Sequence, residues 1–189
     1  MIKSKLIRMM AVLALAISML LTSTGMAFAL GSSSIAVYEN GTSVGTITVN
    51  DVGNNLYNYS THKSGQQKYY TGKGTALVSL LYQKFNIDAD NITQLVVSAT
   101  DSFSRTYNDT TEVTVASLFD GSRKYFPSGG GSGDTQTSIA KAYDTQIATS
   151  VADGLNEASC LRFFLGATST SDSTNDDMVK YVNIIDITD

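Results

Sequence analysis

The sequence offers a single thiol and a single imidazole for nucleophilic catalysis. The chain of 189 residues contains one cysteine, Cys160, and one histidine, His62. A nucleophilic cysteine needs a nearby base or cation that lowers the pKa of its thiol. Cys160 precedes the apolar run Leu161–Leu165, and the only adjacent cation is Arg162, on the same side of a strand. We therefore interpret Cys160 as a small hydrophobic residue that packs at the entrance of a strand.

The candidate metal ligands are His62 and a group of carboxylates near the C-terminus. A metal site needs several convergent ligands. His62 lies in the polar stretch NYSTHKSG without a carboxylate cluster nearby, which is typical of a solvated loop residue. Asp172, Asp176 and Asp177 offer oxygen ligands for calcium, but they lack the glycine and the bidentate glutamate of an EF-hand loop. We interpret this stretch as a solvated polar loop and leave cation binding open.

The first 29 residues have the three parts of a secretory signal peptide. Three basic residues lie within the first eight positions, and an apolar run of about 13 residues follows at Met9–Leu21. Ala27 and Ala29 then form the small-x-small pattern that signal peptidase reads. The apolar run is short for a permanent membrane-spanning helix. We expect residues 1–29 to be removed and the protein to be secreted without a stable membrane anchor.

The charge of the mature chain narrows the class of its partners. The full sequence has 13 basic and 17 acidic residues, a net charge of −4. The signal peptide takes three basic residues with it, so the mature chain has 10 against 17 and a net charge of −7. Such a surface repels nucleic acid and anionic lipid. One cysteine permits no internal disulfide, so a conventional hydrophobic core must stabilise the fold.

Residues 30–189 are enough for one domain, and their pattern predicts an α+β fold with mixed β-sheets and a few short helices. Asn40-Gly41 between β-branched runs predicts a hairpin. The segment TALVSLLYQKF has apolar residues at helical spacing and predicts a helix with Thr75 as its N-cap. The apolar run Leu95–Val97 predicts a buried strand.

The second half of the domain is richer in loops. The segment TTEVTVASLFDG predicts a short helix ended by Gly121, and RKYF predicts a strand. Glycine and serine dominate residues 128–133, which predicts a flexible surface loop rather than a domain boundary. Two strands, in CLRFFLG and in VKYVNIIDI, are expected to close the domain across a polar loop.

Two stretches carry a resemblance to a known family. The order YYTGKGTALVSLLYQKFNIDADNITQLVVSATDSFSRTY resembles the oxidoreductase molybdopterin-binding domain family, which has the sulfite-oxidase-like fold. The family has an aromatic strand, a glycine-containing turn, a Leu-Leu helix and a strand that ends in a corner, which is Asp101-Ser102-Phe103 here. The tail LRFFLG…DDMVKYVNIIDI is similar to the family's closing strands. The resemblance covers roughly residues 35–189 and implies that fold.

The sequence departs from the family where the cofactor binds. Active members hold molybdenum through a cysteine thiolate, and Ser60, Thr61 and His62 stand in that region here. A hydroxyl lacks the soft donor of a thiolate. The family also grips the cofactor phosphate with basic groups after the Leu-Arg strand, whereas the loop after Leu165 is acidic and the chain has no tryptophan. We therefore expect no molybdopterin and no metal.

The resemblance implies that the corner Asp101-Ser102-Phe103 borders a cleft. Asp101 and Arg105 are therefore candidate cleft residues together with His62, although we favour the interpretation that Asp101 caps the turn. We expect a secreted binding or surface-interaction module without catalytic activity, whose partner is an unknown small ligand or extracellular protein. The alternative is a molybdopterin-dependent oxidoreductase in which an atypical ligand holds the metal.

The cleavage site gives a testable prediction. We expect the mature protein to begin at Leu30, because Ala27 and Ala29 fit the two small subsites of the peptidase. Intact-mass measurement of the secreted protein checks this. A mass that includes residues 1–29 would contradict it.

Overall fold

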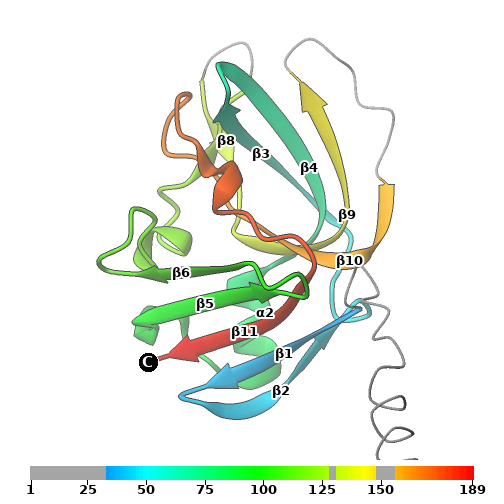
Figure 1. The fold of residues 1–189 in the computed structure, drawn as a ribbon, viewed down its shortest axis with the longest axis vertical. Helices are drawn as coiled ribbons and strands as arrows, with labels where there is room; N and C mark the ends of the chain where they lie inside the picture. Colours follow the sequence, from blue (N-terminus) through cyan, green and yellow to red (C-terminus); the bar gives the residue numbers. More distant parts are fainter. Residues whose placement is uncertain (1–32, 128–130, 148–155) are drawn as a thin grey trace, which may run out of the picture.

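The computed structural model describes residues 33–127, 131–147 and 156–189, and gives only the backbone at 142–147 and 156–160. This part of the protein is mostly β, with one short helix and several 3-10 turns. Its strands form a five-stranded mixed sheet, a four-stranded antiparallel sheet and a two-stranded pair, and the two larger sheets are open. In Figure 1 the four-stranded sheet curves above the five-stranded sheet.

The five-stranded sheet contains both ends of the described chain. Its strand order is β2-β1-β11-β5-β6, and only the β1–β11 pair is parallel. The last strand, which was expected to close the domain, therefore lies at the centre of the sheet. The strands are β1 (Ser34–Glu39), β2 (Thr42–Thr48), β5 (Gln94–Ala99), β6 (Ser104–Asn108) and β11 (Val182–Thr188).

The four-stranded sheet has the order β10-β9-β4-β3 and is antiparallel throughout. Strands β4 and β10 lie in segments where the sequence indicated strands, whereas β9 was missed. The solvated loop expected around His62 is wrong, because His62 belongs to β3 and is partly buried. The strands are β3 (Asn55–Lys63), β4 (Gln66–Ala76), β9 (Ser138–Ile147) and β10 (Asn156–Phe164).

Two-residue turns set the register of both N-terminal hairpins. Asn40 and Gly41 have φ of 49° and 75°, the left-handed pair that a type I′ turn requires. The predicted hairpin of β1 and β2 is thus confirmed. Ser64 and Gly65 adopt the same pair of positive φ angles between β3 and β4.

The predicted helix is present, but its predicted cap is wrong. Helix α2 spans Leu77–Phe85 and buries its leucines in the core. Its N-cap is Ala76, without a side-chain cap. Thr75 belongs to β4, and its hydroxyl accepts a hydrogen bond from the backbone N–H of Gly53 at 2.7 Å, so it is committed to another loop.

The helix expected in TTEVTVASLFDG is reduced to a single 3-10 turn, η2 (Ala116–Leu118). The β-branched residues of this segment disfavour a longer helix. Further 3-10 turns are η1 (Ala89–Asn91) and η3 (Thr174–Asp176). The class is therefore mostly β rather than α+β with a few helices.

The strand expected in RKYF is only two residues long. It is β7 (Lys124–Tyr125), paired with β8 (Gly133–Asp134). The predicted flexible loop 128–133 falls partly outside the described residues, which resume at 131, and its last residue enters β8.

Strand β10 joins the two large sheets. Phe163 and Phe164 are fully buried and alternate to opposite sides of the strand. The Phe163 ring lies 5.5 Å from that of Tyr107 in β6, and the Phe164 ring stacks at 4.9 Å on Tyr59 in β3. In Figure 1, β10 runs along the junction between the sheets.

Gly74 marks the closest approach of β4 to β9. A Cβ atom at this position would lie 2.2 Å from the backbone oxygen of Ile139 and 2.9 Å from the Cα of Ala140. We expect Gly74→Ala to lower the free energy of unfolding by more than about 2 kcal/mol, because backbone atoms cannot move aside cheaply. Urea unfolding measures this. Gly133→Ala is the control, since its new methyl would meet a ring carbon of Tyr125 at 3.5 Å and the backbone oxygen of Tyr125 at 3.9 Å, both ordinary van der Waals contacts. Equal stability of the two variants would contradict the packing described.

Candidate ligand-binding cleft

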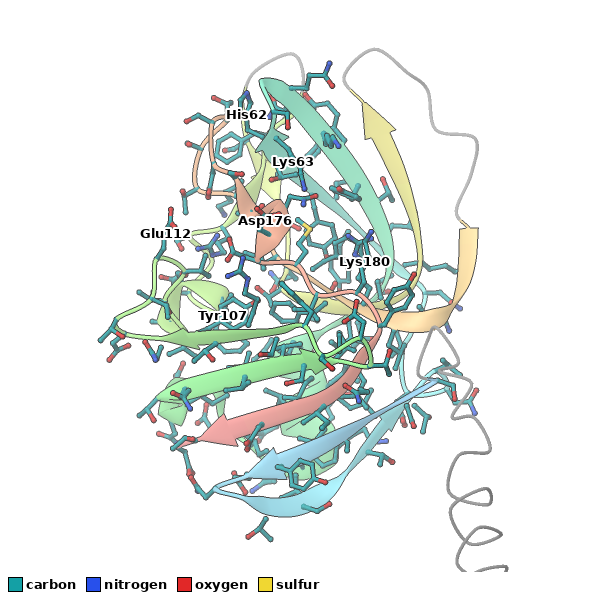
Figure 2. All side chains as sticks on the ribbon, in the orientation of Figure 1. His62, Lys63, Tyr107, Glu112, Asp176 and Lys180 are labelled. Atoms are coloured by element: carbon teal, nitrogen blue, oxygen red, sulfur yellow. The ribbon has the colours of Figure 1, made fainter. Side chains whose placement is uncertain are left out.

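A cavity of about 440 Å³ opens where the two sheets meet. Strands β3, β4, β6 and β10 contribute to its wall, together with the β5–β6 corner and the segment that precedes β11. Figure 2 shows Lys63, Asp176 and Lys180 in this region between the sheets. We call this cavity the cationic cleft; it is lined by Lys63, Lys68, Tyr70, Asp101, Phe103, Arg105, Arg162, Asn175, Asp176, Met178 and Lys180.

The lining of the cationic cleft has a charge opposite to that of the whole chain. Five of its side chains are cationic and two are carboxylates, Asp101 and Asp176, whereas the chain has a net charge of −4. Clustered charge of one sign in a hollow focuses the local field and concentrates ions of opposite charge. The arrangement can therefore attract an anion despite the acidic surface elsewhere.

Arg162 is the buried cation of the cleft. Its residue is 3% exposed. The guanidinium carbon lies 4.8 Å from the ring centre of Phe164 and 5.4 Å from that of Tyr70. Aromatic faces stabilise a desolvated guanidinium at such distances. The planar group thus lies against both rings at the cleft wall, a setting in which arginine can bind an oxyanion through two parallel N–H groups.

The turn η3 ties the cleft wall to both sheets. The Tyr70 hydroxyl on β4 donates to Asn175 Oδ1 at 2.9 Å, and the Tyr107 hydroxyl on β6 donates to the backbone oxygen of Asp177. Arg105 Nε donates to the backbone oxygen of Asp176 at 2.5 Å. These bonds fix the backbone of the turn across the junction between the sheets.

The Asp176 side chain lies among these cations. Its Oδ1 is 3.4 Å from Lys63 Nζ and accepts a hydrogen bond from Asn175 Nδ2 at 3.2 Å. The Asn175 hydrogen bond, with the charge of Lys63, lowers the pKa of the Asp176 carboxyl, so the group is ionised at neutral pH. The cleft thus contains an anion of its own.

Two of the three residues expected at a cleft line this one. Asp101 and Arg105 are in the wall, and Asp101 also caps its turn by accepting a hydrogen bond from the Phe103 N–H at 3.2 Å. His62 is absent from the described lining. It pairs with Gln67, and in the same ladder Thr61 pairs with Lys68, so alternation places His62 on the opposite face of the sheet from the cleft residue Lys68. The backbone N–H of His62 donates a hydrogen bond to the backbone oxygen of Asp172.

Sequence reasoning missed four of the five cations. Lys63 and Lys68 lie on β3 and β4, and Arg162 and Lys180 come from near the C-terminus. One local signal was available in the turn at Ser64-Gly65, which fixes the register of β3 and β4. In this register Lys68 lies opposite Thr61. Thr61 is two residues before Lys63 on the same strand, so Lys63 and Lys68 share one face of the sheet. No local signal brings Arg162 to them, because β9 separates β10 from β4 in the sheet.

The acidic loop does not gather its carboxylates. Asp172 accepts hydrogen bonds from the backbone N–H and the hydroxyl of Thr168, at 2.8 and 2.9 Å. Asp176 faces Lys63, and Asp177 lies 3.8 Å from Arg105 Nε. The three carboxylates therefore have separate partners, and no group of three potential metal ligands occurs among the residues that the structure describes.

The residues present do not fit a molybdenum cofactor. Ser60 is buried and its hydroxyl accepts a hydrogen bond from the Phe126 N–H at 2.9 Å, on the face of the sheet away from Lys68. No described side chain of the cleft carries a thiol. Cys160 lies in β10, but its side chain falls outside the described part, so its expected role in packing stays a prediction.

A second cavity of about 330 Å³ shares Arg105 with the cationic cleft. Its wall is made of hydroxyl and carboxyl groups around β6, including Glu112 and Asp177 (Figure 2 labels Glu112). Burial raises the pKa of the Asp177 carboxyl. With two carboxylates and one cation, this cavity does not attract anions.

Comparison with known proteins adds no relative: no family model and no curated protein matches the chain. Within residues 33–127, 131–147 and 156–189, no helix is long and apolar enough to cross a membrane.

Proposed function

We propose that the chain is a secreted, non-catalytic binding module on a sulfite-oxidase-like fold, and that its cationic cleft holds a small anionic ligand. The observation that carries this proposal is the convergence of five cationic side chains, from separate segments of the chain, on one cavity of an acidic protein. Like charges repel one another, so such a cluster costs stability and is best accounted for by an anion that the cleft takes up.

The burial of Arg162 supports the same reading. Taking a guanidinium out of water costs several kcal/mol unless its surroundings compensate, and apolar residues of similar size often give a more stable core. Arg162 nevertheless occupies the junction of the sheets, where it opens onto the cleft. A positioned cation at a ligand site is a physical reason for that placement.

The order of elements supports the proposed fold. An aromatic strand, β4, leads directly into α2, and β5 follows with the corner at Asp101. The tail then returns as β11 in the middle of the same sheet as β5. The resemblance implies an aromatic strand, a helix, a strand that ends in a corner and closing strands, and the order of β4, α2, β5 and β11 is consistent with it. Secretion is also part of the proposal. It rests on the predicted signal peptide, which lies outside the residues that the structure describes.

Anion binding can be measured by isothermal titration calorimetry with inorganic pyrophosphate at fixed ionic strength. We expect saturable binding to the mature chain. Lys68→Gln should weaken it roughly fivefold, since Lys68 is half-buried and a charge contact that solvent can reach contributes up to about 1 kcal/mol. Lys124→Gln is the matched control, because Lys124 is ion-paired to Asp134 at 3.1 Å and is absent from the described cleft lining.

The absence of binding at millimolar pyrophosphate would contradict the proposal. Equal loss of affinity in both lysine variants would show that binding depends only on net charge and would also contradict it.

The oxidoreductase alternative predicts a bound metal. We expect elemental analysis of the protein, purified from a molybdenum-replete native host, to find no stoichiometric molybdenum, because Ser60 and Thr61 offer hydroxyls where the family offers a thiolate. About one molybdenum atom per chain would overturn the non-catalytic assignment.

A further inference from the structure

The carboxylate of Asp176 occupies a position that a ligand anion would otherwise take. Its side chain is 66% exposed, and Lys63, its partner at 3.4 Å, is 42% exposed. Exposed ion pairs of this kind contribute little to stability. The pair can therefore open at small cost, which would release Lys63 to another anion.

The turn that holds Asp176 has bonds that do not involve its carboxylate, although that carboxylate also accepts a hydrogen bond from Asn175 Nδ2. Arg105 binds the backbone oxygen of Asp176, and Tyr70 binds the side chain of the preceding residue, Asn175. The carboxylate could rotate towards solvent while these bonds keep the cleft wall in place. The second carboxylate of the cleft differs, because Asp101 accepts a hydrogen bond from the Phe103 backbone in its own turn.

We infer that the ligand of the cationic cleft is a small polyvalent oxyanion, and that Asp176 is an internal competitor that sets this requirement for valence. This inference rests on the proposed anion binding. In the cleft, the ligand replaces the Asp176 carboxylate on Lys63 and also reaches Arg105, Arg162 or the remaining lysines.

A count of charges gives the reason for the selectivity. A monovalent carboxylate that displaces Asp176 exchanges one singly charged partner of Lys63 for another, so it gains little. A sulfate, a phosphate ester, a pyrophosphate or a citrate places two or more negative charges among five cations. The additional charged oxygens of such a ligand accept hydrogen bonds that the single carboxylate of Asp176 cannot accept, and arginine supplies two parallel N–H donors for them.

The test is a valence series on the mature chain at constant ionic strength, with acetate, sulfate, citrate and pyrophosphate as probes in calorimetry. For the unmodified chain, we expect no measurable binding of acetate and increasing affinity from sulfate to the more highly charged probes. The ranking of citrate against pyrophosphate distinguishes a polycarboxylate ligand from a phosphate ligand.

Asp176→Asn separates competition from structure. We expect this variant to bind sulfate and pyrophosphate roughly two- to fivefold more tightly, the range that one exposed ion pair provides. In a Lys63→Gln background the same change should have a smaller effect, because the competitor no longer has that partner. Asp90→Asn is the control: it alters the net charge equally from an exposed position in η1, outside the described cleft lining.

The outcomes distinguish a failure of the proposed anion binding from a failure of the competitor role of Asp176. If no probe binds to the unmodified chain or to any variant, the proposed function fails, and this inference fails with it. If the unmodified chain binds pyrophosphate but folded Asp176→Asn binds it equally or less tightly, only the competitor role is overturned. Acetate binding as tight as that of pyrophosphate would overturn the requirement for valence.

Discussion

The packing of β10, an edge strand of the four-stranded sheet, against the five-stranded sheet is the constraint on which the rest of the structure depends. Phe163 packs toward Tyr107 of the five-stranded sheet, and Phe164 stacks on Tyr59 of the four-stranded sheet. Arg162 lies two residues before Phe164 and shares its face, so the same alternation that fills the core also delivers a guanidinium to the cleft. Stability and the proposed binding function therefore rest on one short strand.

Electrostatics give the cleft its chemical character. The carboxylates of the C-terminal loop each bind a different partner, so they stabilise the cleft wall and do not converge on one cation site. What remains is a hollow where cations outnumber carboxylates in an otherwise acidic protein. The acidic surface repels anions at long range, whereas the net positive lining attracts them within the cleft.

Local signals in the sequence predicted local structure well. Asn40-Gly41 identified its hairpin because the turn type depends on two residues alone. Thr75 was assigned wrongly because its hydroxyl bonds Gly53, a partner distant in sequence. Strand β9 was missed and four cleft cations went unrecognised because their positions also depend on partners distant in sequence. Pairing within the four-stranded sheet and the path of β10 bring the strands and the cations together. Asp101 and Arg105 were singled out only through the family resemblance.

The central claim is that anions bind at the junction of the sheets, and NMR tests it most directly. The side-chain Nε–H resonances of Arg105 and Arg162 can be followed in a ¹⁵N-labelled mature chain during titration with pyrophosphate. The account predicts saturable shifts of both resonances and of backbone amides in residues 174–180, with little change at the distant hairpin turn Asn40-Gly41. Saturable shifts confined to other surfaces, with both arginine resonances unmoved, would contradict it.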